Sequence, residues 1–174
     1  MSLFNENFNS FFESILFFLV TNFCLLFMAW MWRRAKPFSL PQSLPLWFKI
    51  WLGIIWLIGI ILPILTMLLW GLWWSHTVVL QAMIPYFIML ALQGLSEKVI
   101  LKVFQSSVWA IIPCFYLPYR IWQLHSGLTL LVMKSEPILV QKVLLLEMIF
   151  WLVSYVVHLS QIPTFLNWNI LEDE

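Results

Sequence analysis

The chain has 174 residues, of which 63% are hydrophobic and only 10% are charged, and its net charge is +1. A soluble domain carries about 25% charged residues, and a chain of this size cannot bury so much apolar surface in its own core. The composition therefore excludes a soluble domain and predicts an integral membrane protein with the lipid bilayer as a partner. The nine Lys and Arg residues are too few and too scattered for a nucleic-acid-binding surface.

The apolar residues form unbroken runs close to the roughly 20 residues that a membrane-spanning helix needs. The strands of a transmembrane β-barrel instead alternate apolar and polar residues in segments of about ten. We therefore predict an all-α, multi-pass membrane helix bundle that forms a single domain, residues 1–174.

The first predicted span is 14–32. Residues 1–13 contain no Lys or Arg, whereas a secretory signal begins with a positive region, so we expect this span to be retained. Positive residues follow it at Arg33, Arg34 and Lys36. The stretch 36–49 contains three prolines at intervals of four residues, which predicts an extended connector at the membrane surface.

The second predicted span, 50–70, contains no ionisable residue. Pro63 is expected to kink it, because proline removes one backbone hydrogen bond and crowds the preceding turn. Gly53 and Gly59 are candidates for close approach of another helix. A short turn at 75–77 is expected to follow.

Polar residues follow one helical face in each of the last two predicted spans, 78–95 and 143–161. In the first span, the positions at intervals of four residues carry the polar side chains Gln81, Gln93 and Glu97, with Pro85 and Met89 between them. In the second they are Glu147, Ser154, His158 and Gln161. We expect these faces to point into the bundle, because an amide or carboxyl that faces hydrocarbon has no hydrogen-bond partner.

Lys and Arg occur only in two blocks, 33–49 and 98–142. The positive-inside rule places both blocks on the cytoplasmic side, or the stromal side in a plastid. Both termini and the turn at 75–77 are then predicted to lie on the non-cytoplasmic side.

Residues 106–133 are apolar enough to suggest a further span, but such a span would move Lys134 and Lys142 to the outer side. Arg120 at mid-membrane would also cost about 2.5–3.5 kcal/mol on insertion scales. We therefore predict four spans plus a re-entrant or interfacial helical hairpin at 106–133. It either turns near Pro118-Tyr119-Arg120 or lies flat with Trp109 and Trp122 at the headgroups. The alternative is five spans with the C-terminus inside.

Glu147 is the strongest candidate for a functional residue, because ionisable groups within a span often mark functional sites. Arg120 is its expected partner. Glu97 is another acid that could pair with Arg120, and Gln93 lies on the same helical face as Glu97. These four residues form the candidate polar site. The competing interpretation is a structural salt bridge that fixes the hairpin to the bundle.

His76 and His158 are predicted to lie at equal depth on different helices, which is how a haem or a chlorophyll can be held. Neither this nor carotenoid binding is needed to explain the sequence, so we expect no cofactor. Most of the twelve Trp residues fall at the predicted membrane surfaces, and Trp56 and Trp151 alone lie at mid-depth. The sequence contains no catalytic or metal-binding motif, and Cys24 and Cys114 lack the spacing of a metal or redox pair.

The stretch 85–124 reads PYFIMLALQGLSEKVILKVFQSSVWAIIPCFYLPYRIWQL. Its combination of Gln93, Glu97, Pro113, Pro118-Tyr119-Arg120 and Trp122-Gln123-Leu124 resembles uncharacterised integral membrane proteins of cyanobacteria and chloroplasts. The resemblance covers about 40 residues and implies a cyanobacterial inner membrane or a thylakoid membrane.

Three functions are compatible with these features. The first is a non-catalytic accessory, assembly or scaffolding subunit of a larger membrane complex, such as a photosynthetic one, or of a homo-oligomer. The second is an oligomeric transporter or channel that uses Glu147. The third is a membrane enzyme acting on lipid or isoprenoid through Glu97, Arg120 and His125.

Overall fold

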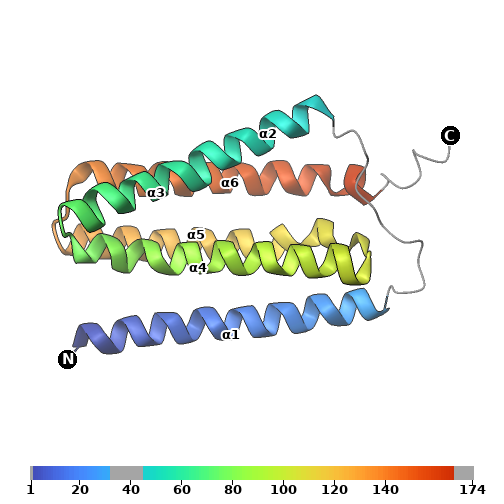
Figure 1. The fold of residues 1–174 in the computed structure, drawn as a ribbon, viewed down its shortest axis with the longest axis horizontal. Helices are drawn as coiled ribbons and strands as arrows, with labels where there is room; N and C mark the ends of the chain where they lie inside the picture. Colours follow the sequence, from blue (N-terminus) through green and yellow to red (C-terminus); the bar gives the residue numbers. More distant parts are fainter. Residues whose placement is uncertain (1, 32–44, 167–174) are drawn as a thin grey trace. The chain divides into compact units, whose positions relative to one another are not determined.

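The computed structural model describes residues 2–31 and 45–166, with side chains described at 12–31 and 45–164. All regular elements of the described residues are helices (Figure 1). They are α1 (Ser2–Met31), α2 (Leu46–Trp56), the π-helix η1 (Leu57–Ile61), α3 (Leu62–Thr66), the π-helix η2 (Met67–Trp73), α4 (Thr77–Val99), the π-helix η3 (Ile100–Phe104), the 3-10 helix η4 (Ser107–Ile111), α5 (Ile112–Met133) and α6 (Ile138–Leu166).

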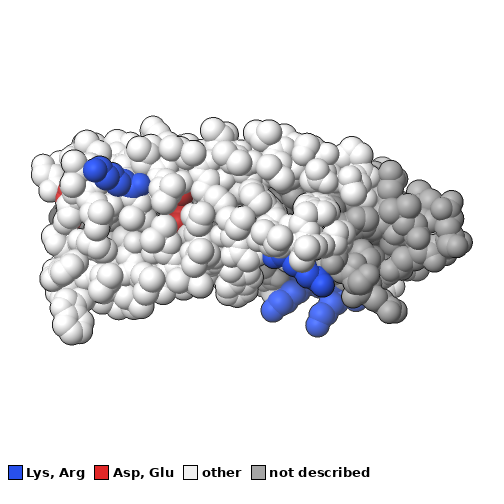
Figure 2. Space-filling view, turned by 90° about the horizontal axis from the view of Figure 1, so that it is seen from above, with Lys and Arg blue, Asp and Glu red and all other residues white. Residues whose placement is uncertain are grey.

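Four helical segments are long and apolar enough to cross a membrane: Phe12–Met31, Leu46–Trp73, Thr77–Phe104 and Ile138–Thr164. They coincide with the four predicted spans, so the prediction of an all-α membrane bundle is confirmed. Charged side chains cover little of the described surface on the face in Figure 2, and many exposed residues of these helices are large and apolar. The connector from 32 to 44 and the acidic residues after 166 lie outside the described residues.

The Leu46–Trp73 helix continues through Pro63 without a break, but not as a regular α-helix. Proline has no N–H, so the carbonyl of Gly59 loses the donor that position 63 would supply in an α-helix. The chain adapts by forming the wider π-helical turns η1 before Pro63 and η2 after it. The predicted local distortion at Pro63 thus takes the form of altered hydrogen bonding.

Contacts between Cα atoms divide the chain into two compact units. The described part of unit 1 comprises 2–31, 89–116 and 155–166, and unit 2 comprises 45–88 and 117–154. Unit 1 therefore contains all of α1, and unit 2 contains all of the Leu46–Trp73 helix. α4, α5 and α6 each contribute one portion to each unit.

The turn predicted near Pro118-Tyr119-Arg120 is wrong, because Pro118 lies inside the single 22-residue helix α5. One proline removes one helical hydrogen bond, whereas a turn would leave several backbone groups unpaired in an apolar environment. The chain turns earlier, at Gln105, which has a φ of 45°. Ser106 then caps η4 by accepting a hydrogen bond from the N–H of Val108 at 3.3 Å.

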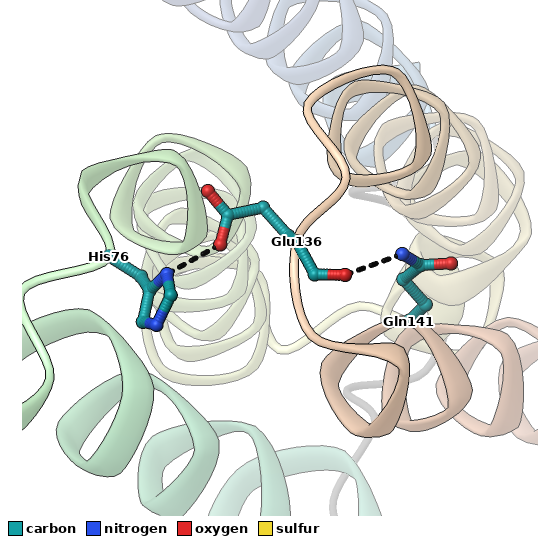
Figure 3. Close-up of polar contacts among 3 residues, drawn as sticks. All are labelled: His76, Glu136 and Gln141. Atoms are coloured by element: carbon teal, nitrogen blue, oxygen red, sulfur yellow. Dashed lines mark hydrogen bonds and ion pairs between the residues drawn. The ribbon is translucent and has the colours of Figure 1, made fainter.

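The positive-inside rule placed the turn at 75–77 and the turn before α6 on opposite sides of the membrane. In unit 2 these two turns touch each other. His76, just before α4, lies with its Nδ1 2.7 Å from Oε2 of Glu136, just before α6 (Figure 3). The prediction that these two turns lie on opposite sides is therefore wrong. It rested on only two positive residues, Lys134 and Lys142, and a direct contact between the turns contradicts it. α5 is about 33 Å long at 1.5 Å per residue, enough to cross the bilayer core. The number of spans, four with a hairpin or five, stays a prediction.

Candidate functional site

Arg120 lies in the interior of unit 2 and is only 2% exposed. Its guanidinium carbon is 4.2 Å from the ring centroid of Trp151 and 5.6 Å from that of Tyr86. Such cation–π contacts contribute about 2 kcal/mol when the cation is desolvated. Side chains from α4, α5 and α6 thus surround a positive charge that hydrocarbon alone would not tolerate.

A chain of hydrogen bonds connects this cluster to the Leu46–Trp73 helix. The indole Nε1 of Trp151 donates to the hydroxyl of Tyr86 at 3.0 Å, and that hydroxyl donates to the carbonyl of Gly59. This is the carbonyl that Pro63 deprives of its usual donor. Tyr86 therefore satisfies the acceptor that the proline exposes.

Gly59 also explains how the helices approach closely enough for this bond. A Cβ atom at position 59 would lie 2.5 Å from Cζ2 of Trp151, so only glycine fits without movement. The predicted close approach is confirmed at Gly59. At Gly53 no other part of the described chain approaches, because an added Cβ meets nothing within 4 Å.

Glu147 is completely buried in the same unit. Neither of its carboxyl oxygens has a hydrogen-bond partner among the described residues, and it forms no ion pair with them. Trp151 lies one turn further along α6, but its single N–H already donates to Tyr86. Arg120 attracts the carboxyl electrostatically. The expected partners thus share one buried cluster, although the guanidinium stacks on Trp151 and makes no direct ion pair with Glu147.

The other two candidate residues, Gln93 and Glu97, belong to unit 1. They lie one turn apart on α4, and Nε2 of Gln93 donates to Oε1 of Glu97 at 2.8 Å. Both side chains are half-buried. The structure therefore describes Gln93 with Glu97 in one unit, and Arg120 with Glu147 in the other.

Unit 1 contains a second polar cluster that the sequence analysis missed. Nδ2 of Asn22 donates to the Tyr116 hydroxyl at 2.8 Å, and the Ser96 hydroxyl donates to Oδ1 of Asn22 at 2.7 Å. The Ser96 and Tyr116 hydroxyl oxygens are 3.0 Å apart, which closes the triangle. It joins α1, α4 and α5, as interhelical polar contacts commonly do in membranes. The available signal was Asn22, an isolated amide within the first span.

The two histidines predicted as haem or pigment ligands lie in different units, and each contacts another group. In unit 2, Nδ1 of His76 lies 2.7 Å from Oε2 of Glu136. In unit 1, Nε2 of His158 lies 2.7 Å from the carbonyl oxygen of Ala110. Their equal depth in the membrane stays a prediction. Within 12–31 and 45–164, no three His, Cys, Asp or Glu side chains are grouped so that they could hold a metal ion.

The four apolar helices and the buried polar clusters place this protein in the class of multi-pass integral membrane proteins. No family model matches the chain, and neither a curated protein nor a solved structure is significantly similar to it.

Proposed function

We propose that the protein is a non-catalytic accessory, assembly or scaffolding subunit that binds a partner within the bilayer. The partner is a transmembrane helix of a larger complex or of a second copy of this chain. It docks on the outer surface of the Leu46–Trp73 helix, at Ile50, Gly53, Ile54, Trp56 and Leu57. We call these five residues the docking face.

Trp56 carries this proposal. It is the eleventh residue of a 28-residue helix, about 15 Å from the end at Leu46, so it lies close to mid-depth. Its side chain is 60% exposed, and its indole N–H has no hydrogen-bond partner among the described residues. Tryptophan is normally enriched at the membrane surface, where the N–H reaches water or headgroups. At mid-depth, a partner helix can supply the acceptor that lipid tails lack.

Gly53 supports the same surface. It is exposed, and an added Cβ there would meet nothing in this chain. Internal packing therefore gives no reason for a glycine at this position. A small residue beside Trp56 allows the backbone of a neighbouring helix to approach, which is the usual geometry of close helix contacts in membranes.

The test is affinity purification from native membranes in mild detergent, comparing the wild type with Trp56→Leu. We expect Trp56→Leu to reduce the associated protein several-fold. Trp73→Leu is the matched control, because Trp73 is 81% exposed on the same helix but lies at its end. A wild-type protein that is strictly monomeric, or an equal loss in both variants, would contradict the proposal. A complex that contains only this chain would identify the partner as a second copy.

The resemblance of residues 85–124 supports a further proposal, that the membrane is a thylakoid or a cyanobacterial inner membrane. Mass spectrometry and an absorbance spectrum of the same purified complex would test it. Photosynthetic subunits and bound pigment are the expected result, and a complex lacking both would argue against this setting.

The transporter or channel is the second candidate function, and the buried, unpaired carboxyl of Glu147 favours it. Ion flux in reconstituted vesicles that persists unchanged in Glu147→Gln would remove this candidate.

A further inference from the structure

The carboxyl of Glu147 lies in an interior that offers it almost no solvation. The side chain has no exposed surface, and neither oxygen has a hydrogen-bond partner among the described residues. Two neighbouring donors are already engaged, since the N–H of Trp151 binds Tyr86 and the hydroxyl of Tyr86 binds Gly59. An ionised carboxylate without donors is strongly disfavoured in such surroundings, whereas a neutral carboxylic acid is tolerated.

The charged and titratable groups around Glu147 can be named element by element. α5 supplies Arg120 and α4 supplies Tyr86. On α6 itself the nearest ionisable neighbour is Lys142, which is exposed. The Leu46–Trp73 helix has no ionisable side chain after Lys49. Among the described residues, Arg120 supplies the positive charge near the carboxyl, and its guanidinium stacks on the ring of Trp151.

The same neighbours decide which ligand fits. A metal cation would need several oxygen ligands, and no such group exists among the described residues. The positive charge of Arg120 would also repel a second cation. A proton needs no ligand shell, because it binds covalently to the carboxyl oxygen and cancels the charge. It is therefore the ligand that suits a buried carboxyl without hydrogen-bond donors. Burial favours binding of the proton, and the charge of the nearby guanidinium opposes it.

We propose that Glu147 is an intramembrane proton-binding site, which holds an exchangeable proton at neutral pH. Buried acids in membrane helices mark proton pathways in many pumps and transporters. The inference deepens the second candidate function, but it does not depend on the docking face. A subunit that only scaffolds a complex could carry the same protonated carboxyl.

The test is infrared spectroscopy of the purified full-length protein in lipid at pH 7. A protonated carboxyl has a C=O stretching band above the amide I region, and we expect Glu147→Gln to abolish that band. The band should also shift when water is exchanged for heavy water. The matched controls are Glu97→Gln and Glu136→Gln, which alter carboxyls that have a polar partner, Gln93 and His76 respectively, and should keep the band.

Two results would overturn the proposal. One is a spectrum in which Glu147→Gln removes no carboxylic acid band. The other is a band that does not shift in heavy water, because its proton does not exchange. If Glu147→Gln fails to fold, wild type labelled with carbon-13 glutamate gives the answer. The band must then shift with the label and persist when each of the other six glutamates is replaced by glutamine: Glu6, Glu13, Glu97, Glu136, Glu172 and Glu174.

Discussion

Replacing Gly59 by alanine tests the packing of unit 2 with the smallest available change. The added methyl group would lie 2.5 Å from Cζ2 and 3.1 Å from Cη2 of Trp151. Trp151 has little freedom to move, because Arg120 stacks on its ring and its N–H binds Tyr86. The helix carbonyl at position 59 is itself held by Tyr86. The methyl group must therefore displace the indole or the helix.

The expected magnitude follows from these contacts. Overpacking a close-packed interior costs about 1–3 kcal/mol, and a displaced indole also loses a hydrogen bond of about 1 kcal/mol. Replacing glycine by alanine in a helix returns about 1 kcal/mol. We expect Gly59→Ala to lower the free energy of unfolding by about 2 kcal/mol. Gly53→Ala has open space around the new methyl and should be neutral or slightly stabilising.

The assay is reversible unfolding in mixed detergent micelles of increasing dodecyl sulfate content, followed by circular dichroism. Both variants change the same residue type on the same helix, so their difference isolates the contact with Trp151. Equal stability of the two variants would refute the close contact between Gly59 and the indole.

Two further predictions concern the membrane topology and unit 1. In a cysteine-free background, Ser75→Cys and Ser135→Cys should react with an impermeant thiol reagent from the same side of sealed vesicles, because their neighbours His76 and Glu136 are in contact. Labelling from opposite sides would instead support the topology that the positive-inside rule predicts. Asn22→Leu should destabilise the protein by about 1–3 kcal/mol in the same unfolding assay, since it removes the amide that hydrogen-bonds to both buried hydroxyl groups, those of Ser96 and Tyr116. No loss of stability in Asn22→Leu would show that the triangle does not hold α1.

The sequence by itself determined the class of the protein and the positions of its apolar helices. Hydropathy is a local property, and a run of some 20 apolar residues has few alternatives to a membrane helix. Local rules also predicted that Pro63 would distort its helix and that Gly59 would allow close approach. They predicted that Gln93 and Glu97 would share a face, since one turn separates them. The face that carries Glu147 and Ser154 is likewise buried as predicted.

The tertiary structure decided what each polar group meets. Arg120 stacks on Trp151, and His76 reaches Glu136 across 60 positions of sequence. No periodicity encodes such pairings, because they depend on how whole helices pack and on where the chain reverses. The positive-inside rule gave the wrong result for the turns that contain His76 and Glu136. It predicts the side of a loop from its number of Lys and Arg residues and takes no account of individual contacts. Proline led to a wrong turn at Pro118 and a correct distortion at Pro63. The difference is that a helix tolerates one lost hydrogen bond when its remaining backbone groups stay paired.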